Sequence, residues 1–438
     1  MRSNKTPIII LFVALLFMTD QAMAQPAFDL IKADRYFSAC NYRLYPTPDT
    51  TAYTPAPAGK RPFYISHYGR HGSRFLNSKK AYIIPYNILH QADSLGKLTT
   101  LGQNVKKQLA IIIADCEGRW GDLSTIGQQQ LRDIARRMMN NFPEVFEGDA
   151  HVQARSTVVN RCLLSMGTAL QQMMIMNPRL QIDMDASMHD MWYMNFQDKL
   201  LRDSMMTYKA KRVYNQFSKL KHRNDKLLSR LFNDSVYVRE KVDDVWLNYY
   251  LLKTELMQTN TYNYEQVASS DLFTDEEIYL FWQRENAWWY ISYGPSLLNG
   301  GQEPYTQRKL LRKLIQDADS CIQMEKPGAQ LRFAHETTLL PLTCLLGLNG
   351  FDFQTENLDE VEAHGWWASL VITMAANLQF VFYRNDVNDN DIMFKVLLNE
   401  EEAMLPIPTD VAPYYHWRDF KSYYLKKLDN YDKMRNEQ

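Results

Sequence analysis

A short apolar stretch that runs into a charged loop is the feature that most limits how this chain folds. Residues 62–67 have the composition of a buried β-strand, and the pentapeptide Arg70-His71-Gly72-Ser73-Arg74 follows them. In open α/β sheets ligands bind at the carboxyl ends of the strands, so we expect a binding site at this loop. Gly72 has no side chain, which lets the loop close on a small ligand. A histidine between two arginines suits chemistry on phosphate, although an Arg-His-Gly tripeptide alone is also compatible with a packing or capping role.

Two further predicted strands end in residues of the same chemical kind. Residues 151–154 are predicted as a strand, and Arg155 follows at the junction with a helix, where free backbone amides favour an anion. Residues 330–334 are predicted as a short buried strand that ends in His335 and Glu336. An ion pair with a carboxylate at the helix end is the alternative role for Arg155.

These strand ends contain the groups that phosphoryl transfer through histidine requires. The reaction needs a neutral imidazole as nucleophile, fixed cations around the phosphate oxygens, and an acid near the leaving oxygen. His67, on the predicted strand just before the loop, is expected to be a packed residue with no part in this chemistry.

The chain alternates strands and helices towards both ends but not in its middle. Helices are predicted over residues 81–116, 128–141 and 158–173, the second capped by Ser124 or Thr125. Strands over residues 378–383 and 394–398 are expected at the sheet edge, and an amphipathic helix over residues 417–431 closes the chain. Between these parts, residues 183–323 show long helical patterns and a capping box from Thr274 to Glu277.

We therefore predict an α/β protein, a three-layer α/β/α sandwich with a mixed central sheet and an inserted helical cap domain. Residues 25–182 and 324–438 form the predicted core, and residues 183–323 form the predicted cap.

One part of the predicted cap is strongly basic. A solvated helix face is the ordinary explanation, and the alternative is that some of these bases face the pocket and attract a multiply charged anion. The bases are Lys209, Lys211, Arg212, Lys219, Lys221, Arg223, Lys226 and Arg230.

Residues 1–24 have the features of a cleaved secretory signal. Arg2 and Lys5 precede an apolar run over residues 8–18, which is too short to span a bilayer, and small residues follow at 22–24. Its removal leaves 47 basic and 49 acidic residues, a balance that does not favour nucleic acid or a membrane surface. We therefore expect an exported protein, periplasmic or secreted, without stable membrane insertion.

The cysteines are widely spaced and follow no pattern of metal ligands. In an exported protein one or two disulfides are compatible with the five residues, while buried free thiols are the commoner case. The residues are Cys40, Cys116, Cys162, Cys321 and Cys344.

The motifs together resemble those of the histidine acid phosphatases, the branch of the histidine phosphatase superfamily that includes phytases and multiple inositol polyphosphate phosphatases. The RHGxR box of that family matches residues 70–74, and its middle arginine matches Arg155. Its closing His-Asp or His-Ala-Glu box matches residues 335–337. Residues 121–127 and 374–379 also resemble the family.

This resemblance implies a mechanism and a role for each site residue. His71 would attack phosphorus and form a phosphohistidine that water then hydrolyses, and Glu336 would protonate the leaving alkoxide. No metal or other cofactor is implied. The groups that would hold the phosphate are Arg70, Arg74, Arg155 and His335.

Two departures from the family pattern concern the walls of the pocket. Phe75 and Leu76 follow Arg74, where the family box often continues to a proline. Glu336 occupies the position of the family aspartate, one methylene longer, while Thr337 stands where the inositol phosphatases have their glutamate.

The resemblance implies an exported phosphomonoesterase that acts on a small anionic phosphate ester, in the first place an inositol polyphosphate such as phytate. One alternative is a broad-specificity or sugar-phosphate acid phosphatase of the same fold. Another is a non-catalytic protein that binds phosphate esters, which would not need His71, His335 and Glu336 together. Nothing in the sequence indicates nucleic acid as a partner or defines the oligomeric state.

Overall fold

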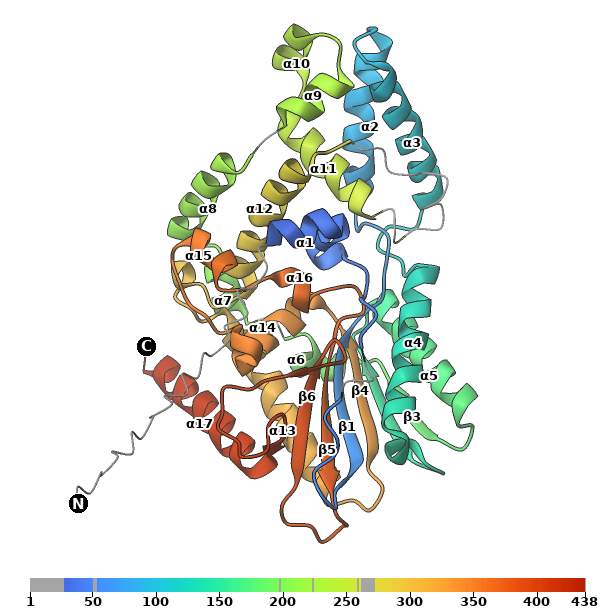
Figure 1. Ribbon diagram of the computed structural model, residues 1–438, viewed down its shortest axis with the longest axis vertical. Coiled ribbons are helices and arrows are strands. Elements are labelled where there is room, and N and C mark those ends of the chain that lie inside the picture. The colour runs from blue at the N-terminus through green and yellow to red at the C-terminus, as the bar shows by residue number, and fades with distance from the viewer. Residues whose placement is uncertain are drawn as a thin grey trace, which may run out of the picture.

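A mixed β-sheet organises the lower half of the molecule (Figure 1). The computed structural model describes residues 27–49, 53–196, 198–222, 224–257, 260 and 272–437, so the predicted signal peptide lies outside the described residues. The strands are β1 (Arg61–Arg70), β2 (His151–Ser156), β3 (Gln181–Asp185), β4 (Gly328–Ala334), β5 (Asn377–Arg384), β6 (Met393–Leu398), β7 (Glu401–Ala403) and β8 (Tyr415–His416).

The strand order places β1 near the centre of the sheet. The order is β3-β2-β4-β1-β5-β6-β7, with β8 paired to β6. The first four strands in this order are parallel to one another, whereas β5, β6, β7 and β8 each pair antiparallel with their neighbours. The β1–β4 pair aligns Arg70 with Ala334, so the carboxyl ends of these two strands lie side by side.

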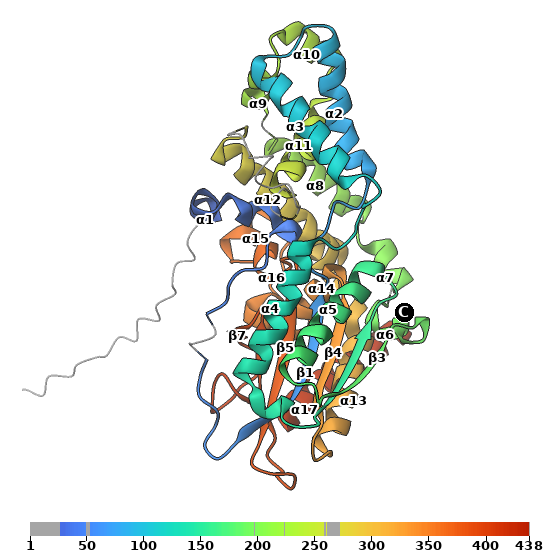
Figure 2. The same cartoon turned by 90° about the vertical axis from the view of Figure 1, so that its right-hand side faces the viewer.

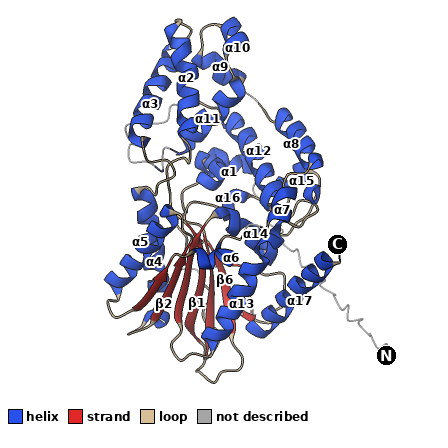
Figure 3. Ribbon diagram, turned by 180° about the vertical axis from the view of Figure 1, so that it is seen from behind, coloured by secondary structure: helices blue, strands red, loops and turns tan. Residues whose placement is uncertain are grey.

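Helices cover both faces of the sheet, as the side-chain alternation of β1 requires. Ile65 of β1 and Leu331 of β4 pack with residues of α4 (Thr125–Asn141) and α5 (Asn160–Met176). On the other face Tyr64 and Phe380 pack in the cluster that contains residues of α13 (Arg308–Ile322), α14 (Glu336–Leu346) and α17 (Trp417–Asn436). Figure 3 shows α4 and α5 on one side of the strands and α13 and α17 on the other. The predicted three-layer architecture is confirmed.

A helical region extends from the end of the sheet at which the parallel strands β1 and β4 finish (Figure 2). Most of its helices come from two separate parts of the sequence, residues 79–116 and 199–293. The remaining helices of the described chain are α1 (Ala27–Ala33), α2 (Lys79–Ser94), α3 (Thr100–Cys116), α6 (Met191–Met194), α7 (Lys199–Ser204), α8 (Tyr208–Leu220), α9 (Asp225–Leu231), α10 (Ser235–Lys241), α11 (Asp244–Met257), α12 (Asp275–Tyr293), α15 (Leu358–Ala363) and α16 (Ala368–Val371).

The hairpin formed by α2 and α3 belongs with the helices of the middle segment. Leu98 and Phe232 form an isolated β-bridge, and the backbone amide of Thr99 donates to the carbonyl of Leu231 over 3.0 Å. The chain thus enters the helical region once before β2 and again after β3 (Figure 1). The predicted domain boundaries stay a prediction, but the capping box from Thr274 to Glu277 at the start of α12 is confirmed.

Two expectations about the sheet need correction. Strand structure does not end before Asp183, because β3 continues to Asp185. β5 and β6 are not edge strands, since β5 lies between β1 and β6, and β6 pairs with β5, β7 and β8. All residues of β5 and β6 are buried. Near-continuous burial of this kind is typical of strands that are covered on both faces.

The cysteines are all free and buried. The alternative of one or two disulfides is therefore not realised in this structure. None of the helices formed by the described residues combines the length and the apolar character that a membrane span needs.

Candidate active site

Two histidines meet where the parallel strands end. His71 follows β1 directly, His335 follows β4, and their ring centroids lie 5.7 Å apart. The backbone amide of His71 donates to Ala334 O over 3.1 Å, and its carbonyl accepts from the amide of Ala375 over 3.0 Å. Because these bonds extend the sheet pairing on both sides, the position of His71 is fixed by the backbone.

The imidazole of His71 presents one free nitrogen to the site. Its Nδ1 lies 2.9 Å from the carbonyl oxygen of Gly72. A carbonyl oxygen only accepts, so Nδ1 carries the proton and Nε2 keeps its lone pair. Nε2 is buried and has no hydrogen-bond partner among the described residues. Burial, followed by the charge of Arg70, holds the pKa of His71 well below its usual value, so the ring is neutral, as a nucleophile requires.

Glycine at position 72 is explained by a close contact between two loops. A Cβ on Gly72 would lie 2.4 Å from the carbonyl oxygen of Gly127, and a Cβ on Gly127 would lie 2.2 Å from Ser73 O. Ser124 caps α4 as predicted, and its amide also donates to Ser73 O over 2.9 Å. The motif at residues 121–127 therefore holds the histidine loop from the side of α4.

Glu336 lies at the centre of the site with its two oxygens in different surroundings. It begins α14, is 7% exposed, and its Oε1 accepts from Arg70 Nη2 (2.8 Å) and from Asn41 Nδ2 (3.1 Å). Its Oε2 lies 3.8 Å from Nε2 of His71. Burial raises the pKa of this carboxyl, but Arg70, followed by His71, more than offsets the burial, so that the pKa lies well below its usual value.

Three arginines surround these groups and have nitrogens without partners. The Nε atoms of Arg70, Arg74 and Arg161 are buried and form no hydrogen bond within the described part of the chain. The Nη1 atom of Arg70 donates to three backbone carbonyls, and Nη1 of Arg74 donates to Phe75 O. Buried charged donors without partners are costly, so this arrangement fits a site completed by an anion.

Arg161 is a candidate site residue that the sequence motifs did not identify. It lies in the first turn of α5, and its charge acts on His71, Glu336 and Arg74. Burial lowers the pKa of Arg161, and the neighbouring charge of Arg74 lowers it further. Both effects are expected where guanidinium groups gather in a buried site.

Arg155 does not join the others, so its predicted place in the phosphate site is wrong. β2 extends to Ser156 and α5 begins only at Asn160, which leaves Arg155 inside the strand. Its neighbours Ala154 and Ser156 are buried towards one face, and Arg155 points to the other. There its guanidinium pairs with Asp183 (2.8 Å) and approaches Asp190 (3.7 Å). The alternative of an ion pair with a carboxylate is the one the structure supports.

His335 contacts a threonine and a cysteine from the β2–α5 connection and α5. Its Nε2 lies 3.3 Å from Oγ1 of Thr157, and Sγ of Cys162 lies 3.8 Å from both ring nitrogens. Burial lowers the pKa of His335 to about 4. Burial also raises the pKa of Cys162 to about 12, so its thiol is not a reactive group.

A metal ion is the other ligand that these side chains could hold. The ligand atoms of His71, His335 and Glu336 lie within 4.8 Å of one another. The charges of Arg74 and Arg161 act on His71, and such positive charges repel a cation and attract an anion. The charge balance therefore favours a phosphate.

The remaining residues singled out in the sequence lie outside the site. His67 packs on Phe333 within the core, with ring centroids 5.4 Å apart, which confirms its predicted role. Phe75 and Leu76 are buried in a hydrophobic cluster that also contains residues of α2, α3 and α11.

The basic run in the helical region is mainly a solvated face. Lys209 pairs with Glu356 and Lys221 with Asp359 (3.2 Å), and Arg223 lies outside the described residues. The remaining described bases of α8 and α9, apart from the partly buried Arg230, are exposed: Lys211, Arg212, Lys219 and Lys226.

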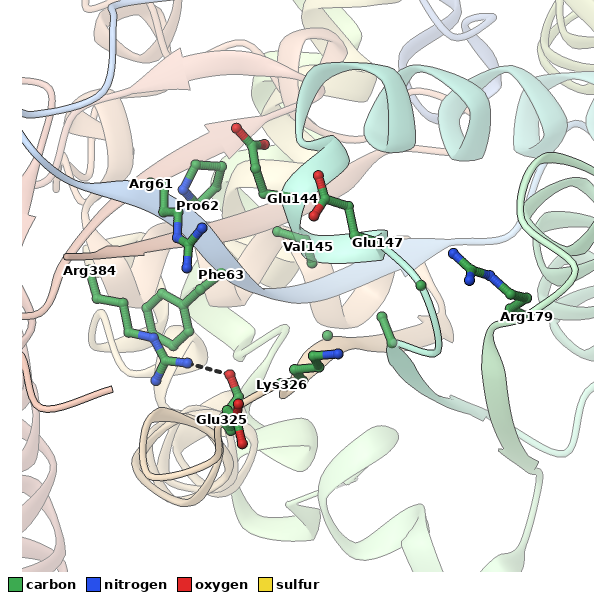
Figure 4. A pocket seen from close by; sticks show the side chains of 13 residues that line it. Arg61, Pro62, Phe63, Glu144, Val145, Glu147, Arg179, Glu325, Lys326 and Arg384 are labelled. Carbon is green, nitrogen blue, oxygen red and sulfur yellow. Dashed lines mark hydrogen bonds between the residues drawn. The ribbon is translucent and has the colours of Figure 1, made fainter. Parts of the chain in front are cut away.

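A separate pocket of about 480 Å³ lies at the opposite end of β1 and β4 (Figure 4). Its cationic side chains, such as Arg179 and Lys326, are accompanied by Glu144 and Glu147. The guanidinium of Arg384 is already used by backbone carbonyls, including that of Glu325. The lining contains no histidine, so this pocket lacks the groups needed for phosphoryl transfer.

Fold and site together define an α/β protein with a buried, arginine-lined anion site around two histidines and a glutamate. A family model described as the histidine phosphatase superfamily (branch 2) matches residues 69–399. The chain belongs to this family, which confirms the resemblance found in the motifs.

Relatives with known names agree with this membership. Over 110 residues the chain is 28% identical to multiple inositol polyphosphate phosphatase 1 of Dictyostelium discoideum, a match that covers 24% of this chain and only 17% of that protein. The fold is similar to the multiple inositol polyphosphate phosphatase of Bifidobacterium longum in complex with inositol hexasulfate, with a TM-score of 0.70, 18% identity, and coverage of 89% of this chain and 97% of that chain. It is also similar to the phytase from D. castellii, with a TM-score of 0.60, 14% identity, and coverage of 90% of this chain and 85% of that chain.

Proposed function

We propose that this protein hydrolyses phosphate monoesters through a phosphohistidine on His71. The observation that carries the proposal is a set of buried nitrogens without partners among the described residues: Nε2 of His71 and the Nε atoms of three arginines whose charges act on His71. A phosphoryl group placed there meets a nucleophile and the cations that stabilise its charge. A protein that only bound phosphate esters would not need a neutral histidine with a free nitrogen.

In the first step Nε2 of His71 attacks phosphorus, and the bond from phosphorus to the ester oxygen breaks. The negative charge of the bound ester opposes the cations that lower the pKa of Glu336, so in the complex Oε2 carries a proton and gives it to the leaving oxygen. Oε2 lies 3.8 Å from Nε2 of His71. Arg74, Arg161 and His335 hold the phosphoryl oxygens, for which guanidinium forks are well suited. Arg70 is also a proposed phosphate ligand and donates to a phosphoryl oxygen through its Nε, which has no partner among the described residues.

In the second step water attacks phosphorus and the bond to Nε2 breaks. The carboxylate of Glu336 takes the proton from this water, so the site returns to its starting state with inorganic phosphate bound. Bond formation and proton transfer balance over the two steps without any further reactant.

The proposed substrates are inositol polyphosphates such as phytate. The support comes from relatives, whose names include multiple inositol polyphosphate phosphatases and phytases, one of them in complex with inositol hexasulfate. We also propose that the protein is exported, because residues 8–18 have the apolar character of a signal peptide.

Phosphate release from phytate, glucose phosphate and para-nitrophenyl phosphate, measured across pH, tests this function. We expect release from phytate to be the most efficient. We also expect activity to persist below the usual pKa of histidine, because the lowered pKa of His71 keeps the nucleophile unprotonated as the pH falls. Release from none of the three esters would contradict the proposal, and a preference for glucose phosphate would assign the protein to the broader class of acid phosphatases.

Glu336→Gln should separate substrates by their leaving groups. The amide fills the same space but has no acidic proton, so we expect kcat for phytate to fall by about a hundredfold or more. The leaving group of para-nitrophenyl phosphate needs no proton, so the rate of phosphohistidine formation from this ester should change little. Pre-steady-state release of para-nitrophenol measures this rate. Equal losses for both substrates in this step would remove Glu336 as the acid.

A further inference from the structure

Asn41 reaches the active site from a part of the chain that carries none of the family motifs. It lies in the 3-10 segment Arg35–Tyr42, ahead of β1, and is 8% exposed. Its Nδ2 donates to Oε1 of Glu336 over 3.1 Å, and its backbone carbonyl accepts from Nη1 of Arg70 over 2.5 Å. One residue thus contacts both the carboxyl group and the arginine that pairs with it.

We propose that Asn41 is a positioning residue, which turns the carboxyl group of Glu336 so that its proton-carrying oxygen faces the leaving group. The inference rests on the acid role of Glu336 in the proposed function. The side chain of Asn41 donates to Glu336, whereas its contact with Arg70 uses only the backbone carbonyl, which the Asn41 variants retain, so the side chain acts through Glu336.

The two donors on Oε1 decide which oxygen carries the proton. Oε1 accepts from Arg70 Nη2 and from Asn41 Nδ2, so a proton on Oε1 would displace one of these bonds. Oε2 has no such donor among the described residues and lies 3.8 Å from Nε2 of His71. The proton therefore resides on Oε2, leaves from it to the ester oxygen, and returns to it from water.

Asn41 is the uncharged donor among the groups that face this carboxyl. Loss of its hydrogen bond to the ionised form raises the pKa of Glu336, because the charged state is then less stabilised. The charged and titratable groups around the carboxyl are Arg70, His71, Arg74, His335, Arg161 and Cys162.

The backbone around Asn41 is held independently of its side chain. The preceding residue Cys40 has a φ of 49° and a ψ of −115°, a strained conformation that persists only where neighbours impose it. Ser369 of α16 donates to Cys40 Sγ over 3.6 Å, and its carbonyl accepts from Arg43 Nη1 over 3.2 Å. The amide of Met374 donates to the carbonyl of Arg43 over 2.8 Å. Figure 1 shows this part of the chain between the sheet and the helical region.

The test compares Asn41→Ala and Asn41→Asp with the unmodified protein on glycerol phosphate and para-nitrophenyl phosphate. For Asn41→Ala we expect kcat on glycerol phosphate, which has a poor leaving group, to fall about tenfold, and para-nitrophenyl phosphate to stay within about twofold. In the plot of kcat against pH, the alkaline limb, which reflects the loss of the proton of Glu336, should move to higher pH. Asn41→Asp keeps the size but replaces the donor by a negative charge, so the limb should move further.

Arg43→Ala is the matched control for mere loosening of the segment. It removes the contact with the carbonyl of Ser369 but leaves the donor on Glu336 in place. The alkaline limb should stay where it is in the unmodified protein. Equal losses on both esters, an unmoved limb in the Asn41 variants, or the same movement in Arg43→Ala would each overturn the positioning role.

A second measurement separates this inference from the proposed function. If the unmodified protein released phosphate from neither ester, the proposed function would fail by itself. Carbon NMR of the Glu336 carboxyl, assigned by its loss in Glu336→Gln, needs no turnover. Its pKa should be higher in Asn41→Ala than in the unmodified protein, and an unchanged pKa would refute the orienting hydrogen bond.

Discussion

Replacing His71 by alanine should abolish turnover of every phosphate ester, with kcat lower by about a thousandfold or more. No other described side chain offers an unpartnered neutral nitrogen at the centre of the arginine cluster. Steady-state phosphate release on phytate and on para-nitrophenyl phosphate measures the loss. The loss should be equally severe for both substrates, because both need the nucleophile.

The backbone contacts of His71 provide the control for folding. The bonds to Ala334 and Ala375 use only the main chain, so His71→Ala should keep its circular dichroism spectrum and still bind inorganic phosphate. Substantial hydrolysis of para-nitrophenyl phosphate by a folded His71→Ala variant would remove His71 as the nucleophile.

Arg161→Ala should be the most damaging of the arginine substitutions that lie outside the pentapeptide. It removes a cation from the buried site, and loss of one such contact with a transferring phosphoryl group lowers kcat/KM by about 10²- to 10³-fold. Arg155→Ala is the matched control, because the two arginines lie six positions apart but only Arg161 acts on His71. We expect Arg155→Ala to change kcat/KM by less than about threefold.

The opposite order of these two effects would contradict the geometry of the site. A severe loss in Arg155→Ala with an unimpaired Arg161→Ala variant would show that the arginine on β2 serves the phosphate after all. The pairing of Arg155 with Asp183 argues against this outcome.

The sequence predicted the parts of the site that depend on local chemistry. The pentapeptide and the His335-Glu336 pair could be placed because each follows a short apolar run that has to end at the same edge of a parallel sheet. Which arginine joins them depends on where α5 begins. Thr157, Val158 and Val159 are β-branched and favour extended backbone, which delays the helix to Asn160 and brings Arg161 into its first turn. That run was the signal in the sequence that would have identified Arg161.

Features that depend on contacts between distant segments could not be predicted in this way. The hairpin of α2 and α3 joins the helical region through Thr99 and Leu231, which no local pattern connects. Asn41 is an example of the same kind, since it lies 295 residues before its partner Glu336. The central position of β5 was predictable in principle, because its apolar run indicated burial on both faces.

The central claim is that His71 carries the phosphoryl group between the two steps. Its most direct test is rapid alkaline quenching during turnover of phytate, followed by mass spectrometry of the peptide that contains residues 70–74. We predict an acid-labile phosphoryl group on His71 that is absent from the His71→Ala variant. Turnover without any phosphorylated histidine at this position, or with the phosphoryl group on another residue, would contradict the account.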